Sequence, residues 1–139
     1  MSTGGKIQLR VLTPARQMFD GEVRSVILPT FDGLWGILPG HAPFVAILGT
    51  GRMVIRDLAG NAKAIAVRGG FFQVAHDELT VLTSQGALKE DVTPEALREE
   101  REALESKVIV GKDGRQRLEE QMLWVKARED ALRQPPEHY

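Results

Sequence analysis

The chain has 139 residues, 42% of them hydrophobic and 27% charged, a balance typical of a folded protein with one ordinary domain or one small domain and an appendage. Its formal net charge of −1 gives no overall attraction to nucleic acid or to anionic lipid. The absence of cysteine excludes disulfides, thiolate nucleophiles and cysteine-based zinc sites.

Up to about Gly86 the sequence is typical of short β-strands. Apolar residues alternate with polar or short ones in 7–11 and again in 22–29 (EVRSVILP), as strands require. Turn residues follow at short intervals, and Gly69-Gly70 predicts a bulge or a tight hairpin. No helical segment of ten residues intervenes, which disfavours a parallel α/β fold. An antiparallel sandwich or barrel is therefore predicted for this part.

Residues 36–44, GILPGHAPF, combine two glycines, two prolines and one histidine. Such a segment can run neither as a helix nor as a central strand, so a shaped turn is predicted. Nothing near His41 in the sequence supplies a nucleophile or an orienting acid, so we expect a structural or interface role for it. His76 is expected in a hairpin turn. No paired acid and base and no metal-ligand spacing is found, so neither an enzyme nor a cofactor is predicted.

From Thr93 the pattern becomes helical. Residues 93–107 open with a capping threonine, a proline and acids, and an apolar stripe of Leu97, Leu104 and Val108 follows. After a break at 110–114, a second helix is predicted from about Asp113 to Arg133, and its apolar stripe is Leu118, Met122, Val125 and Leu132. The sequence predicts a helical hairpin and leaves open whether it is a fixed cap or a mobile arm.

The sequence shows no pattern typical of a targeting signal or a membrane span. No apolar run approaches the roughly 20 residues that span a bilayer. Residues 1–10 lack the apolar core of a signal peptide and the amphipathic character of a transit peptide. A cytoplasmic protein is therefore expected.

Three stretches resemble the epsilon subunit of bacterial and chloroplast F-type ATP synthases. They are residues 12–48, 51–56 and 66–86, and their succession of PxxxxFxGEV, DGxxGILPGHAP and GGFxxV is highly specific. The tail matches only in architecture. The resemblance implies an α+β fold: a flattened antiparallel β-sandwich of about ten strands in residues 1–87, then a two-helix regulatory tail in 88–139.

The resemblance also implies a function. Epsilon subunits are non-catalytic parts of the rotating central stalk, which couples ion-driven rotation of the c ring to ATP synthesis, and in many bacteria the tail inhibits ATP hydrolysis. The expected partners are the gamma subunit, the c ring and, through the tail, the alpha and beta subunits, without nucleic acid or lipid insertion. The expected location is peripheral, on the cytoplasmic side of the bacterial plasma membrane. The alternative is a free-standing β-sandwich adaptor for an unrelated partner.

The candidate residues for the gamma or c-ring interface lie within the segment 32–44. They are Asp32, Leu34, Trp35, His41, Pro43 and Phe44. Leu34 stands where many family members have an acidic residue, so an apolar contact with the ring is expected in place of a charged one. Glycine and proline would fix the loop before binding and so reduce the ordering entropy lost on docking.

The tail holds two further sets of candidates. The basic residues of the second helix would meet an acidic loop of the beta subunit, as in inhibitory family members; they are Arg115, Arg117, Lys126 and Arg128. Some members bind ATP through an aliphatic residue, an acid, two variable residues, arginine and alanine. Glu95 and Arg98 match this pattern, but Pro94 and Glu99 replace the aliphatic residue and the alanine. ATP binding is not expected, because Glu99 adds a negative charge near the phosphates.

Overall fold

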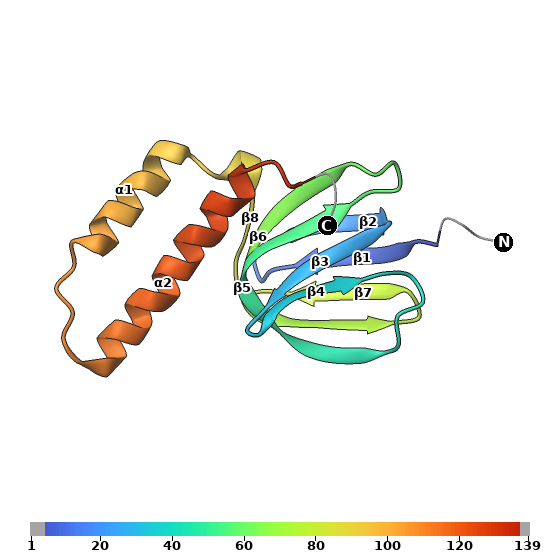
Figure 1. Cartoon of the computed structure of the whole chain (residues 1–139), viewed down its shortest axis with the longest axis horizontal. Helices are drawn as coiled ribbons and strands as arrows, with labels where there is room; N and C mark the ends of the chain where they lie inside the picture. The colour runs from blue at the N-terminus through green and yellow to red at the C-terminus, as the bar shows by residue number, and fades with distance from the viewer. Residues whose placement is uncertain (1–4, 137–139) are drawn as a thin grey trace.

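The computed structural model describes residues 5–136, in which a layered β domain is followed by two helices (Figure 1). The strands are β1 (Ile7–Leu12), β2 (Gln17–Val23), β3 (Ser25–Thr30), β4 (Gly33–Ile37), β5 (Phe44–Arg56), β6 (Ala62–Ala75), β7 (Glu78–Leu82) and β8 (Gly86–Leu88). A short 3-10 turn, η1 (Lys89–Asp91), leads to α1 (Pro94–Glu105) and α2 (Gly111–Leu132).

The β domain is a sandwich whose two layers share β5 and β6. These strands pair with each other along nearly their whole length, but their two halves have different outer neighbours. β6 pairs with β8 at 65–67 and with β7 at 71–75, while β3 pairs with β5 at 54–56. One layer therefore holds β4, β3, the second half of β5, the first half of β6, and β8. The other holds the first half of β5, the second half of β6, β7, β1 and β2.

Two glycines allow β6 to pass from one layer to the other. Gly69 and Gly70 have φ values of 59° and 118°, which side-chain-bearing residues rarely adopt. A Cβ atom on Gly70 would lie 1.9 Å from the carbonyl oxygen of Leu82, so only glycine fits there. The Gly69-Gly70 pair is thus a bend inside one strand, and the alternative of a hairpin is wrong.

The predicted fold class is confirmed, with two differences in detail. Eight strands are found among residues 5–136 in place of about ten, because β5 and β6 each continue through a bend and serve both layers. The sheet is also mixed, since β1 runs parallel to β7 while it is antiparallel to β2.

The core lies between the layers. Ile7, Leu9 and Val11 point inward from β1, as their alternation requires, and the same pattern recurs along the other strands. The first half of β6 is buried on both faces: Ile65 faces this core, whereas Ala66 belongs to a second apolar cluster with α2. The outer face of one layer is therefore the floor on which the tail lies.

The helical hairpin is present with shifted limits. α1 ends at Glu105, so Val108 lies in the connection between the helices and is 92% exposed; its assignment to the first apolar stripe is wrong. α2 begins at Gly111, two residues before the predicted start. The predicted stripe of the second helix does face α1, where Leu97, Leu104 and Val125 are buried together.

Candidate functional site

A cluster of rings closes the end of the sandwich farthest from the helices. The aromatic cluster consists of Trp35, His41, Phe44 and the buried Phe72. The Phe44 ring centroid lies 4.8 Å from that of His41, 5.3 Å from Trp35 and 5.7 Å from Phe72. Tilted and edge-on ring pairs at such separations add stability beyond the buried area. The structure therefore brings together three of the predicted residues, and Pro43 adjoins them as an exposed residue of the same loop.

Asp77 anchors the loop that carries this cluster. The N–H of Gly40 donates a hydrogen bond of 2.6 Å to Oδ1 of Asp77, and the Asp77 carbonyl accepts one of 2.9 Å from the Gln8 N–H. His76 and Asp77 have φ values of 53° and 59°, so the hairpin turn predicted at His76 is confirmed. No local sequence pattern links the two residues, because Asp77 is 37 residues from Gly40. The loop is thus tied down before any partner binds.

Two predicted interface residues lie elsewhere. Asp32 is in the β3–β4 turn and Leu34 is at the start of β4, next to the helices, whereas loop 38–43 follows the other end of β4 (Figure 1). Asp32 accepts a hydrogen bond of 2.6 Å from the Thr30 hydroxyl. Leu34 is 63% exposed and lines a groove with Pro29 and the end of α2. The six residues therefore occupy two separate surfaces.

The tail docks on the sandwich through one tryptophan and several alanines. Trp124, Ala127 and Ala131 of α2 are buried against alanines of the strands, which are Ala64, Ala66 and Ala87. Alanine on both sides lets the helix approach the sheet closely. This face of α2 has a weak sequence signal, because alanine contributes little to an apolar stripe; Trp124 is the one large apolar residue in it.

One two-bond ion pair ties the middle of β6 to α2. Arg68 donates from Nε and Nη2 to the two carboxylate oxygens of Glu120, at 2.6 and 2.5 Å, and from Nη1 to Oε1 of Gln85. The Arg68 guanidinium also lies 5.8 Å from the Trp124 ring. The hydrogen bond from Arg68 lowers the pKa of Glu120, and the carboxylate in turn raises the pKa of Arg68.

Two similar pairs join the helices to each other. Arg101 of α1 binds Glu129 of α2 at 2.6 and 2.7 Å, and Arg128 of α2 binds Glu100 of α1 at 2.6 and 2.9 Å. These hydrogen bonds lower the pKa of both carboxyl groups. Arg128 also lies over the Trp124 ring at 4.9 Å. The hairpin is therefore held to the sandwich and to itself by paired charges.

Comparisons with known proteins identify the family. The beta-sandwich domain of the ATP synthase delta/epsilon chains matches residues 6–88. The ATP synthase epsilon chain of Leptospira borgpetersenii is 44% identical over 91 residues, 66% of this chain and 71% of that one. The epsilon chain of Microcystis aeruginosa is 38% identical over 125 residues, 88% of this chain and 90% of that one. The chain belongs to the ATP synthase epsilon chains.

A solved structure has a similar fold over the sandwich and the helices together. A chain of the Euglena gracilis mitochondrial ATP synthase superposes with a TM-score of 0.75 at 22% identity, covering 96% of this epsilon chain and 85% of that chain. The prediction of a non-catalytic central-stalk subunit is thereby confirmed by family membership, and the free-standing adaptor is set aside.

In this epsilon chain the predicted regulatory residues differ in their exposure and in their ion pairs. Arg115 and Arg117 are exposed, and no ion pair of theirs occurs within residues 5–136. Lys126 pairs with Asp130 at 3.3 Å, and Arg128 is engaged as described. The predicted nucleotide residues Glu95 and Arg98 lie exposed on α1 and form no ion pair in the described part of the chain.

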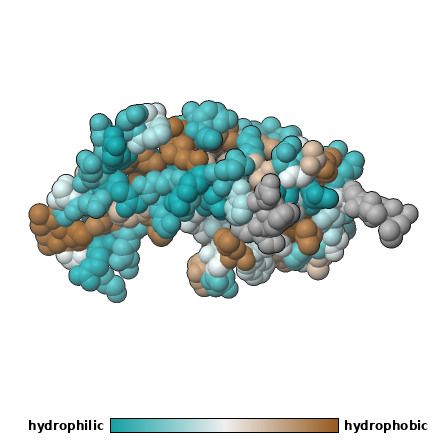
Figure 2. All heavy atoms as spheres, turned by 45° about the horizontal axis from the view of Figure 1, so that its top comes forward, coloured by the Kyte–Doolittle hydropathy of each residue, from teal (hydrophilic) through white to brown (hydrophobic). Residues whose placement is uncertain are grey.

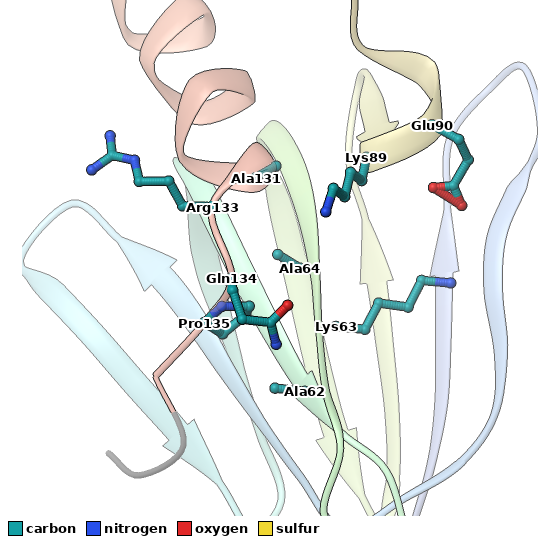
Figure 3. A pocket seen from close by; sticks show the side chains of 9 residues that line it. All are labelled: Ala62, Lys63, Ala64, Lys89, Glu90, Ala131, Arg133, Gln134 and Pro135. Atoms are coloured by element: carbon teal, nitrogen blue, oxygen red, sulfur yellow. The ribbon is translucent and has the colours of Figure 1, made fainter.

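The pocket at the end of α2 is poorly suited to an anion. It has a volume of about 240 Å³, and Lys89 points into it while Arg133 points away (Figure 3). Arg133 pairs with Asp130 at 2.5 Å, and Lys63 lies over the Phe19 ring. The carbonyl end of α2 beside Lys89 carries partial negative charge, which disfavours a phosphate there. None of the helices between residues 5 and 136 is long and apolar enough to cross a bilayer.

Proposed function

We propose that this epsilon chain binds the gamma subunit through the aromatic cluster and loop 38–43, and meets the c ring through apolar residues around the same sandwich. The observation that carries this is the anchored loop: Asp77 holds Gly40 in place while Leu38 and Pro43 stay exposed. A loop ordered in advance loses little entropy on binding and transmits force without rearranging. A rotor joint needs both properties.

The split of the predicted interface suggests two contacts. Loop 38–43 and the aromatic cluster form one, at the end remote from the tail. Asp32 and the exposed apolar Phe31 form the other, in the β3–β4 turn, together with Leu34 at the start of β4. We assign the first to gamma and the second to the loops of the c ring, where an apolar Leu34 suits a contact without a charge pair.

The tail is proposed as a regulatory arm that rests on the sandwich. Residues 1–87 are the binding domain and residues 88–139 the tail, as the sequence suggested. Arg68–Glu120 and the alanine contacts hold the resting position. Arg115 and Arg117 remain exposed for an acidic surface of the beta subunit, and the alpha subunit is the other expected neighbour. The whole subunit would lie peripherally, on the cytoplasmic side of the bacterial plasma membrane.

The test uses the full chain with its cognate alpha–beta–gamma complex. Binding to gamma and the rate of ATP hydrolysis are measured for the unaltered chain, for a His41→Ala/Phe44→Ala variant and for Glu120→Ala. The first variant should bind gamma at least about tenfold more weakly, the loss expected when two central interface side chains are truncated. Glu120→Ala should bind normally and inhibit hydrolysis more strongly, because its tail is released. Normal binding by the first variant would contradict the assigned interface.

A further inference from the structure

The first half of β5 is an edge strand without a partner. Residues Phe44–Leu48 pair with β6 on one side, and within residues 5–136 no strand pairs with them on the other. β3 reaches β5 only beyond this point, where a Cβ on Gly49 would meet the Thr30 backbone at 3.1 Å. Figure 1 shows this half of β5 as the turquoise lower margin of the sandwich. Alternate residues therefore direct their backbone N–H and C=O groups away from β6.

This edge carries none of the features that normally keep edge strands apart. The sequence FVAIL has no charge and no proline. Val45 and Ile47 are 63% and 68% exposed, and the cross-strand neighbour of Ile47 is the exposed Phe71, so the apolar surface continues onto β6. Natural edges are usually protected by lysine, proline or a covering segment, since a bare apolar edge pairs with other chains. We therefore expect a partner segment to occupy this edge when the protein is assembled with its partners.

The length of the free edge is defined at both ends. Pro43 precedes it and has no N–H to donate, and the approach of Thr30 closes it at Gly49. Five residues remain, about 16 Å of strand. The edge also starts where the aromatic cluster ends, because Phe44 belongs to both. It therefore continues the surface assigned above to gamma.

We propose that the edge Phe44–Leu48 takes up an extended segment of the gamma subunit as an added β-strand. This inference rests on the proposed function, since it states how the gamma contact is made. The added strand would exchange backbone hydrogen bonds with the outward groups of β5 and place uncharged, apolar side chains beside Val45 and Ile47. Backbone pairing fixes the register of the two subunits, so the joint cannot slip by one residue without turning every side chain to the other face.

Amide hydrogen exchange on the full chain, free and bound to its cognate gamma subunit, tests the pairing directly. The outward amides of 44–48 should exchange at least about tenfold more slowly in the complex, in an alternating pattern along the strand. The amides already bonded to β6 should change less. If gamma binds and the outward amides exchange as in the free chain, strand addition is wrong.

Substitutions at the edge test the strand pairing independently. Val45→Lys/Ile47→Lys places two charges beside the edge without entering the core, and should weaken gamma binding by at least about tenfold. Val108→Lys is the matched control: it also replaces an exposed apolar residue, but in the connection between the helices, and should change the affinity less than about twofold. Circular dichroism and the melting temperature establish that each variant is folded. Equal affinities for the two variants would overturn the proposal.

Two further outcomes separate this inference from the proposed function. If the unaltered chain fails to bind gamma, both are wrong. If the free chain self-associates with protection of the same amides and gamma leaves them unchanged, the edge takes a second copy of the chain, and only the inference is overturned.

Discussion

Arg68 and Glu120, 52 residues apart in the sequence, are joined by two hydrogen bonds that fasten the tail to the strand bend. Arg68 directly precedes the bend at Gly69. Its backbone N–H donates to the Thr83 hydroxyl at 2.9 Å, and its carbonyl accepts from the Ser84 hydroxyl at 2.6 Å. The backbone of this arginine is thus held rigidly where its side chain meets α2.

Removing this pair should loosen the tail alone. Glu120→Ala is expected to lower the free energy of unfolding by about 0.5–1 kcal/mol, the usual worth of a partly exposed ion pair with good geometry. It should also speed amide exchange in α2, while the sandwich amides stay as they are. Glu119→Ala is the control, because Glu119 is the exposed neighbouring acid. Equal exchange rates in α2 for the two variants would contradict a fastening role.

Acid should release the hairpin. Hydrogen bonds from arginines lower the pKa of Glu100, Glu120 and Glu129 in the folded chain. The folded state therefore binds these protons less readily than the unfolded state. The resulting stabilisation is complete at neutral pH and is lost as pH falls from about 5 through the lowered pKa values. Thermal melting followed at helix-sensitive wavelengths from pH 7 to 3 should show this loss.

The triple variant Glu100→Gln/Glu120→Gln/Glu129→Gln is the control for the acid effect. It should be less stable than the unaltered chain at pH 7 and show a shallower loss of stability below pH 5, because these groups no longer titrate. An unchanged slope would assign the acid sensitivity to other carboxyl groups.

The alanine contact between α2 and the sheet should not tolerate a larger side chain. Ala127 is 1% exposed within that contact. Ala127→Leu should force the helix off the sheet and cost about 1–3 kcal/mol, as overpacking usually does. Ala103→Leu, on the exposed face of α1, should change stability little. Urea unfolding compares the two, and equal midpoints would show that the helix contact adapts to the larger side chain.

The Asp77 anchor should matter for binding more than for folding. Asp77→Gly keeps the positive φ available but removes the acceptor of the Gly40 N–H, so a loss of about 1 kcal/mol and weaker gamma binding are expected. Asp77→Asn retains a carbonyl acceptor and tolerates the same backbone, and should behave nearly as the unaltered chain. Titration with gamma checks both variants. Indistinguishable affinities would show that the loop needs no anchor.

The strand bend should require glycine at position 70. Gly70→Ala brings a Cβ against the Leu82 carbonyl and keeps a φ that alanine avoids, so it should destabilise the chain by about 3 kcal/mol or more. Gly36→Ala in β4 meets nothing within 4 Å and is the control. Denaturant unfolding measures both. A mild effect at Gly70 would mean that β6 bends elsewhere.

The tip of the helical hairpin exposes apolar side chains that belong to no apolar cluster in the described chain. Val108 and Val110 are 92% and 85% exposed in the connection between α1 and α2, and Figure 2 shows apolar atoms gathered at that end of the molecule. Neither residue supports the helix contact. We expect Val108→Ser to leave stability unchanged within about 0.5 kcal/mol, as for exposed positions generally. Urea unfolding checks this, and a larger loss would show that the tip packs in solution.

Local sequence patterns were enough to predict the two-part organisation and the family resemblance. Alternation of period two and apolar stripes of helical spacing are local, so they predict strands before Gly86 and helices after Thr93 whatever the chain packs against. The motif around GILPGHAPF likewise identified the loop that the structure finds anchored.

How these parts pack together depends on contacts between residues far apart in the sequence. The parallel pairing of β1 with β7, the passage of β6 through both layers and the separation of Leu34 from His41 all depend on long-range pairing that no local pattern encodes. The same holds for the face of α2 that lies on the sheet. Its alanines form no apolar stripe in the sequence, and they are buried because alanines on β6 and β8 let the helix approach the sheet. Arg68 and Glu120 become partners for the same reason: the bend in one element brings a cation to a helix from a distant part of the sequence.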